Sequence, residues 1–297
     1  MSRVGGVPTI LPTPLAAQWE VDLASLERLT EFLVGLEVDG VVVLGVMGEA
    51  PKLSEAEQED VITTTVAAAA GRIPVFAGSG AGGTDLAIRK SARAVELGAA
   101  GLLVAPPPVQ SDGVILEYYR RIGETVEAPI VLHDYPAVTG IRLDAGLVAR
   151  LFEEVPAVKA IKLEEPPTGP KITALRSMGS DIGIVGGLGG QYLLEELERG
   201  ADGIMTGLSY PDILVDVYRR FKAGDIAGAR SVFYGACPLL RFEFQPGVGL
   251  ALRKEIYRRR GAMESAFVRH PGAQLDDRLS AELDAVLDHL GLLEVRA

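Results

Sequence analysis

One local pattern recurs along this chain, and it strongly limits the folds available: a helix end, a glycine-containing turn and a short apolar strand. Its clearest copies are residues 36–45 (LEVDGVVVLG), 97–105 (LGAAGLLVA) and 199–207 (RGADGIMTG). Glycine is suited both to a helix C-cap and to a tight turn that enters a strand. The strands are apolar throughout rather than alternating, which is typical of parallel strands covered on both faces. The pattern therefore predicts repeated strand–helix units.

Five further apolar segments bring the predicted strands to eight, with helical patterns between them. These segments are residues 6–11, 74–78, 129–134, 157–162 and 182–186, and the intervening helices include 84–97, 189–199 and one opened by the capping box at Ser54–Glu57. Eight such units predict an α/β protein with a closed (β/α)8 TIM barrel. A doubly wound open sheet is the alternative, but no dinucleotide-binding glycine motif follows the first strand.

After the eighth strand the sequence shows only helical periodicity. The predicted helices cover residues 211–223, 226–241, 247–259 and 277–290. The first of them is enough to complete the barrel. We therefore expect a barrel over residues 1–223 and a C-terminal helical region over residues 224–297 that packs on it.

Charge and composition exclude several classes of function. The chain of 297 residues has 40 acidic and 29 basic side chains and a net charge of -11, which opposes binding to nucleic acid or to an anionic membrane. No apolar run has the length of a membrane span. Cys237 is the only cysteine, so an intrachain disulfide is impossible and a cytoplasmic protein is expected. With three histidines, the sequence predicts no metal site and no cofactor.

Lys162 is the strongest catalytic candidate. It ends the predicted strand 157–162, where period-2 alternation puts Val158, Ala160 and Lys162 on one face. A lysine removed from water should be partly neutral, and a neutral amine can attack a ketone to form a Schiff base. The alternative is a strand-end lysine whose amine reaches solvent. Catalytic residues of such barrels lie at the carboxyl ends of the strands, and this favours the Schiff-base interpretation.

The same rule selects residues after the other strands. His133 shares a face with Val131 and could act as a general acid or base, or it could be a structural histidine bonded to a backbone carbonyl. Tyr135 has the same parity, but it could instead cap the following loop. Glu164 and Glu165 are expected to be solvated or to lie at a helix N-terminus. The predicted substrate-binding positions are Gly45, Val46, Met47, Gly186 and Met205.

Several motifs together resemble the dihydrodipicolinate synthase / N-acetylneuraminate lyase superfamily of class I aldolases. The matching segments are Gly45–Glu49 followed by Leu53–Glu57, Pro136 followed by Thr139-Gly140, Ala160-Ile161-Lys162, and Arg269-His270-Pro271. The resemblance implies a (β/α)8 barrel and an imine between Lys162 and a 2-oxo acid, usually pyruvate. It also implies reversible carbon–carbon bond chemistry or dehydration, and a homo-oligomer, either a tetramer or a dimer.

The chain also departs from the superfamily pattern. Val46 and Met47 replace the usual hydroxyl residues, and His133 replaces the proton-carrying tyrosine. Residues 105–108 contain no tyrosine, and Val138 stands where the synthases have a basic residue. We therefore predict an aldolase, retro-aldolase or dehydratase that acts on a 2-oxo acid and is not a true dihydrodipicolinate synthase. The alternatives are a barrel enzyme that binds phosphate at the glycine-rich segment 186–190, and a non-catalytic relative that binds a metabolite.

Overall fold

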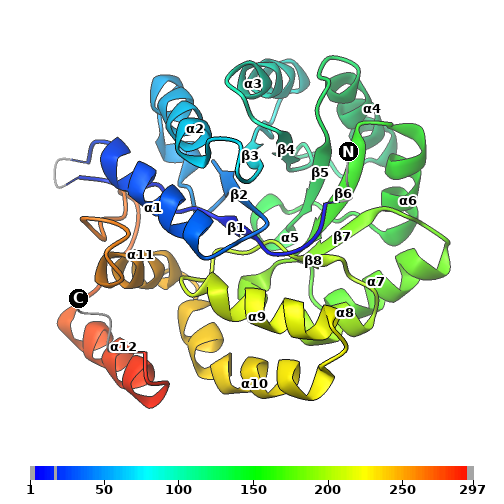
Figure 1. The fold of residues 1–297 in the computed structure, drawn as a ribbon. Helices are drawn as coiled ribbons and strands as arrows, with labels where there is room; N and C mark the ends of the chain where they lie inside the picture. Colours follow the sequence, from blue (N-terminus) through cyan, green and yellow to red (C-terminus); the bar gives the residue numbers. More distant parts are fainter. Residues whose placement is uncertain (1–3, 17–18, 293–297) are drawn as a thin grey trace.

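The computed structural model describes residues 4–16 and 19–292, and its centre is a barrel of eight parallel strands in sequence order (Figure 1). Parallel bridges from Gly6 to Gly203 and from Thr9 to Thr206 join the last strand to the first. The predicted (β/α)8 fold is therefore confirmed. The strands are β1 (Pro8–Ile10), β2 (Gly40–Val43), β3 (Val75–Gly78), β4 (Gly101–Val104), β5 (Ile130–Asp134), β6 (Val158–Leu163), β7 (Gly183–Gly186) and β8 (Gly203–Ile204).

Helices surround the barrel, and several begin at side-chain caps. Ser54 and Glu57 form the predicted capping box, and Asp22, Asp144 and Asp225 each accept a backbone N–H at the start of a helix. The helices of the barrel layer are α1 (Leu23–Gly35), α2 (Glu55–Ala69), α3 (Thr84–Glu96), α4 (Asp112–Gly123), α5 (Pro136–Thr139), α6 (Ala145–Glu154), α7 (Thr168–Ser177), α8 (Leu193–Glu198) and α9 (Pro211–Lys222), with 3-10 turns η1 (Ala50–Lys52) and η2 (Leu188–Gly190).

The segment 189–199 differs from its prediction as one helix. It divides into the turn η2 and the short helix α8, because Gly189 and Gly190 have φ angles of 67° and 87°. Glycine adopts this left-handed conformation without steric strain, and the conformation interrupts a right-handed helix.

The core has two layers. The strand side chains that face the barrel interior form a compact cluster, and those that face outward join the helices in a larger one. The interior cluster contains Val4, Ile10, Val42, Phe76, Leu103, Val131, Ala160, Val185 and Met205. Burial on both sides explains why the strands are apolar throughout.

A register shift in β6 corrects one detail of the predicted strand faces. Ile130 pairs with Val158, but the next residue of β5 pairs with Ala160, so Lys159 is an extra residue in β6. Val158 therefore packs in the outer layer, whereas Ala160 and Lys162 face the interior. Period-2 alternation holds only where the register is continuous.

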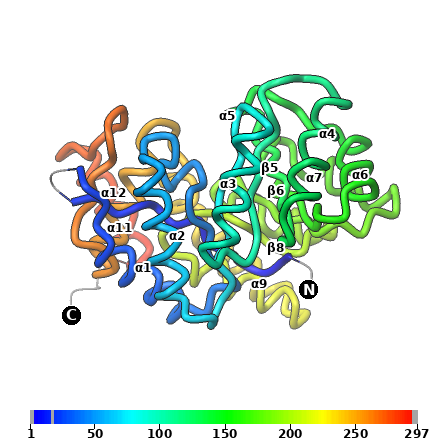
Figure 2. The backbone as a smooth tube through the Cα atoms, turned by 90° about the horizontal axis from the view of Figure 1, so that it is seen from above, coloured from blue at the N-terminus to red at the C-terminus, as the bar shows by residue number. Residues whose placement is uncertain are grey.

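Three helices follow α9: α10 (Ile226–Glu243), α11 (Gly249–Arg259) and α12 (Asp277–His289). Figures 1 and 2 both show α11 and α12 on the side of the barrel where α1 lies. Tyr257 makes an edge-to-face contact with Phe32 of α1 at 6.4 Å, and the guanidinium of Arg260 lies 4.8 Å from the centre of the same ring. No described helix combines the length and apolar character that crossing a membrane requires.

A buried ion pair fastens this region to the loop after β2. Lys254 on α11 is fully buried and donates to Glu49 at 2.6 Å. Glu49 also accepts bonds from the Lys52 amine and from the Arg269 backbone N–H, each at 2.9 Å. Glu49 therefore has a structural role in its loop.

Candidate active site

Lys162 lies inside the barrel near the carboxyl end of β6. It pairs in register with His133 of β5, and its side chain is only 5% exposed. The amine therefore does not extend into open solvent. Its position at the catalytic end of the barrel agrees with the expectation from sequence.

Glu164 is the first correction to the predicted site. We expected a solvated side chain, but Glu164 is 6% exposed and its Oε2 lies 2.6 Å from Nζ of Lys162. The backbone N–H of Leu188 donates to Oε1 at 3.0 Å. Burial alone would raise the pKa of Glu164, but Lys162 and His133 outweigh it and hold that pKa at about 2. Lys162 therefore has a fixed, ionised partner rather than the isolated environment predicted for it.

His133 completes a cluster with these two residues. Its Nε2 is 2.8 Å from Oε2 of Glu164 and 3.4 Å from Nζ of Lys162. Burial and the charge of Lys162 lower the pKa of His133. A neutral imidazole that donates Nε2–H to Glu164 fits the shorter contact, and in this tautomer Nε2 does not accept from the Lys162 amine. His133 therefore contacts both Lys162 and Glu164.

Tyr135 lies beside this cluster, just above His133. The two rings stack with centroids 5.7 Å apart and planes inclined by 29°. Tyr135 occupies the N-cap position of α5, but its side chain makes no capping hydrogen bond there. Burial raises the pKa of its half-buried phenol.

A cavity of about 300 Å³ opens above the amine of Lys162. Its wall contains three of the five predicted substrate-binding residues: Gly45, Val46 and Met47. Further residues that line it are Ile10, Leu103, Tyr135, Glu164, Gly189, Thr206, Gly207, Glu243, Phe244, Gln245, Pro246, Gly247, Gly249, Leu250 and Arg253. An adjoining cavity of about 690 Å³ shares Gly45 and Val46 and reaches His133.

The structure does not bring Gly186 or Met205 to the cavity above Lys162. A side chain at Gly186 would point into Glu196 of α8, on the outer side of the sheet. Met205 is completely buried in the interior cluster. Thr206, the next residue, lines the cavity instead.

Arg253 and Glu243 are wall residues that the sequence analysis did not identify. Arg253 comes from α11 and Glu243 from the end of α10, far along the chain from the strands. Nε of Arg253 donates to Oε2 of Glu243 at 3.3 Å, and Glu243 also accepts the Ser209 N–H at 3.1 Å. A charged residue in one predicted helix and another just after a second predicted helix were the available signal, but the helical pattern does not tell that the two side chains pair or which cavity they face.

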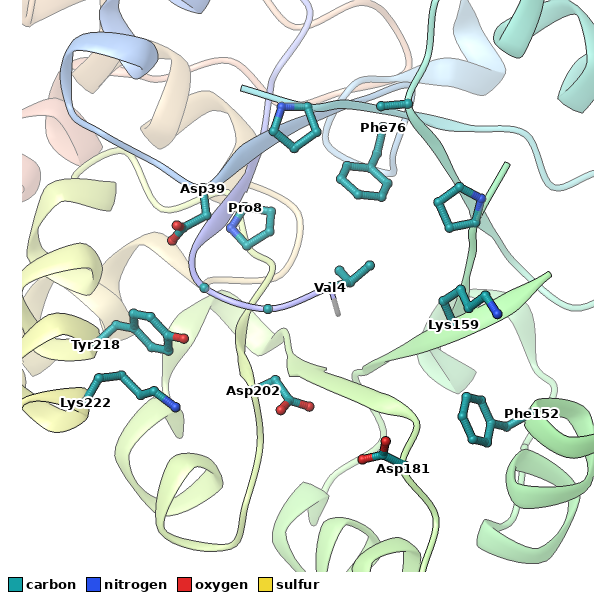
Figure 3. A pocket seen from close by; sticks show the side chains of 15 residues that line it. Val4, Pro8, Asp39, Phe76, Phe152, Lys159, Asp181, Asp202, Tyr218 and Lys222 are labelled. Carbon is teal, nitrogen blue, oxygen red and sulfur yellow. The ribbon is translucent and has the colours of Figure 1, made fainter. Parts of the chain in front are cut away.

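A larger cavity of about 710 Å³ lies at the opposite end of the barrel (Figure 3). Pro8, Asp39 and Asp202, at the amino ends of strands, form part of its wall, together with Lys159 and Lys222. This end of such a barrel serves stability rather than catalysis. The smaller cavity above Lys162 therefore remains the candidate active site.

Comparison with known proteins agrees with this geometry. The sequence profile of the Dihydrodipicolinate synthetase family matches residues 3–290. The chain is 30% identical to L-2-keto-3-deoxyarabonate dehydratase of Azospirillum brasilense, over 99% of this chain and 97% of that protein. It is 37% identical to 4-hydroxy-tetrahydrodipicolinate synthase of Sorangium cellulosum, over 77% of each chain. The crystal structure of dihydrodipicolinate synthase from Rhodopseudomonas palustris superposes with a TM-score of 0.91 at 38% identity, covering 96% of this chain and 97% of that one.

Proposed function

Because this chain belongs to the Dihydrodipicolinate synthetase family of class I aldolase-type lyases, we propose that Lys162 forms an imine with a 2-oxo-3-deoxy sugar acid and that the enzyme dehydrates it. The contact of Lys162 with an ionised, buried Glu164 carries this proposal. The similarity to a 2-keto-3-deoxy acid dehydratase over almost the whole chain supports the choice of substrate class.

The first step transfers a proton from the Lys162 amine to Glu164, across the 2.6 Å contact. The freed amine attacks C2 of the substrate; the carbonyl oxygen takes one proton from the nitrogen and the one held by Glu164, leaves as water and gives the iminium, with Glu164 ionised again. Entry of the substrate excludes water, which weakens the solvation of both charges and favours this neutralising transfer.

The second step removes water from the substrate. Loss of a C3 proton gives an enamine, whose electrons then expel the C4 hydroxyl as water when an acid protonates it. Water afterwards hydrolyses the imine and returns the free lysine. We assign the proton transfer to His133, which contacts both Glu164 and Lys162, with the stacked Tyr135 as the alternative carrier.

The synthase reaction fits this site poorly. Val46 and Met47 line the cavity where the superfamily pattern has hydroxyl residues, and Val138 is 57% exposed where the synthases carry a basic residue. A reaction that needs only an imine and proton transfers is compatible with the groups that remain.

Borohydride reduction tests the covalent step. Incubation with pyruvate or 2-keto-3-deoxyarabonate, followed by reduction, should add the mass of the ligand to the peptide that contains Lys162. Lys162→Arg should abolish the adduct, whereas the control Lys159→Arg, on the same strand outside the catalytic cavity, should retain it. Labelling of Lys159 or Lys171 in the wild-type enzyme would show that the assignment is wrong.

A substrate panel tests the reaction type. Product analysis with several 2-keto-3-deoxy sugar acids should show loss of water without formation of pyruvate and an aldehyde. Release of pyruvate as the main product would replace the dehydratase by an aldolase.

We also propose a homo-oligomer, a dimer or a tetramer, as the superfamily resemblance implies. A monomeric dihydrodipicolinate synthase variant that is 27% identical has the same fold, with a TM-score of 0.91, so this fold also exists in a monomer. Sedimentation velocity at micromolar concentration should give the mass of a dimer or tetramer; a mass near 31.4 kDa would contradict the proposal.

A further inference from the structure

Arg253 is a buried cation that faces the catalytic cavity with most of its hydrogen-bonding capacity unused. The side chain is 7% exposed and lines the cavity together with Lys162. A guanidinium carries five N–H donors. Here, Nε reaches Glu243 at 3.3 Å and Nη1 meets only the sulfur of Met47 at 3.6 Å. Nη2 makes no hydrogen bond within residues 4–16 and 19–292 and is not among the fully buried atoms, and the guanidinium lies 6.0 Å from the centre of the Phe244 ring.

The other charged groups of the cavity already have strong partners. Lys162 and Glu164 lie 2.6 Å apart, and His133 bonds to Glu164. Glu243 is held by the N–H and hydroxyl of Ser209 in addition to Arg253. Arg253 is therefore the charged group of the cavity wall with donors left for a ligand, and an anion would satisfy them.

Arg253 also lies next to the loop after β2, which lacks side-chain donors for a substrate carboxylate. A 2-oxo acid carries a carboxylate into the cavity, but Val46 and Met47 offer it no side-chain hydrogen bond. The contact between Arg253 and the Met47 sulfur places the guanidinium next to this loop. A planar guanidinium matches the two oxygens of a carboxylate.

We propose that Arg253 binds a carboxylate of the 2-oxo acid substrate and that Glu243 positions it through Nε. The inference rests on the proposed imine chemistry for its ligand, and it names a residue from the C-terminal helices as part of the binding site. The carboxylate is either the one on C1, present in pyruvate, or a second one at the far end of a diacid.

The test compares imine trapping by Arg253→Met and Arg253→Lys with trapping by the wild-type enzyme. Pyruvate, 2-oxoglutarate and acetone serve as ligands, and the half-saturating concentration for borohydride inactivation is measured for each. The control is Arg259→Met, on the same helix, because Arg259 pairs with Glu255 and Asp284 and does not line the cavity.

We expect Arg253→Met to raise the half-saturating concentration of a 2-oxo acid by about 10- to 100-fold, the scale of a lost charge-assisted bond. Arg253→Lys should show a smaller rise, because the cation is kept without its planar fork. Trapping of acetone, which has no carboxylate, should be unchanged. If the half-saturating concentration rises for both acids, Arg253 binds the C1 carboxylate. If it rises for 2-oxoglutarate alone, Arg253 binds the distal carboxylate.

Two results would overturn the proposal. One is that Arg253→Met and Arg259→Met give the same half-saturating concentration for each of the two acids. The other is that Arg253→Lys and Arg253→Met both weaken the trapping of acetone as much as they weaken the trapping of the two acids. Thermal melting of each variant checks that it is folded, and Arg253→Lys, which keeps the buried cation, decides the case if Arg253→Met does not fold. Failure of the wild-type enzyme to trap any 2-oxo acid would instead refute the imine chemistry.

Discussion

Glu196 should make the enzyme less stable as the pH rises, and Glu196→Gln should remove this effect. The side chain is 1% exposed on α8, where Oε1 accepts the Thr168 hydroxyl at 2.6 Å. Oε2 is buried without a hydrogen-bond partner in the described ranges. Burial raises the pKa of Glu196 from 4.5 to about 8, so the folded protein keeps this carboxyl protonated at neutral pH.

The sign and size follow from proton linkage. Between pH 4.5 and 8 the folded state holds a proton on Glu196 that the unfolded state has released, so the free energy of unfolding falls as the pH rises. At pH 7 the free energy of unfolding is about 3 kcal/mol lower than it would be with an unshifted Glu196, because each pKa unit corresponds to about 1.4 kcal/mol. For a chain of 297 residues this corresponds to about 5 °C in melting temperature.

The assay is calorimetric unfolding of the wild-type enzyme, Glu196→Gln and the exposed neighbour Glu195→Gln at pH 4.5 and pH 7.5. Glu196→Gln should be more stable than wild type by roughly 4 kcal/mol at pH 7.5 and nearly equal to it at pH 4.5. Glu195→Gln should change stability by less than about 0.5 kcal/mol at either pH. The reasoning fails if Glu196→Gln gives the same difference at both pH values, or if it destabilises the protein at pH 7.5.

Three further predictions concern catalysis. Glu164→Gln should slow borohydride-trapped imine formation by about 100-fold or more, because the amine loses its proton acceptor, while Gln still fits beside Leu188; trapping at the wild-type rate would contradict this role. His133→Ala should form the imine but lose about 100-fold or more in turnover, and the pH–rate profile should lose a limb that lies below the usual histidine pKa, because burial and then Lys162 lower it. If His133→Ala keeps full turnover and Tyr135→Phe does not, the proton carrier is Tyr135. Pyruvate with aspartate semialdehyde should turn over far below the common rate of about 10 per second, and a rate near that value would refute the argument against synthase activity.

The barrel could be predicted from sequence because its signals are local. Three strands follow a glycine-containing turn, most of the strand segments are apolar, and the strand–helix unit repeats often enough to fix the fold class. The break in segment 189–199 was harder to predict, because the left-handed glycines that cause it affect only a single turn. The register shift at Lys159 depends on the pairing of two strands, so period-2 alternation within one strand does not reveal it.

The candidate catalytic cluster was predictable only in part. Lys162 and His133 follow from strand parity and from their place at the strand ends. Glu164 has the same parity as Lys162, yet we expected solvent around it, because its partner His133 belongs to the neighbouring strand. Pairing across strands decides whether a carboxylate after a strand turns inward, and such pairing is a tertiary property.

The C-terminal helices do more than cover the barrel, because two adjacent residues of α11 connect to the candidate active site in different ways. Lys254 is bonded to Glu49 and fixes the loop that carries Val46 and Met47, while Arg253 extends into the cavity beside that loop. Burial lowers the pKa of Lys254 to about 8, and Glu49 opposes this shift. The folded pKa is below the unfolded value, so the Lys254 ammonium becomes neutral in the folded protein above about pH 8, and the ion pair with Glu49 then weakens. Movement of α11 would thus displace both the loop and the guanidinium, which would join the proposed carboxylate binding to the attachment of the C-terminal region.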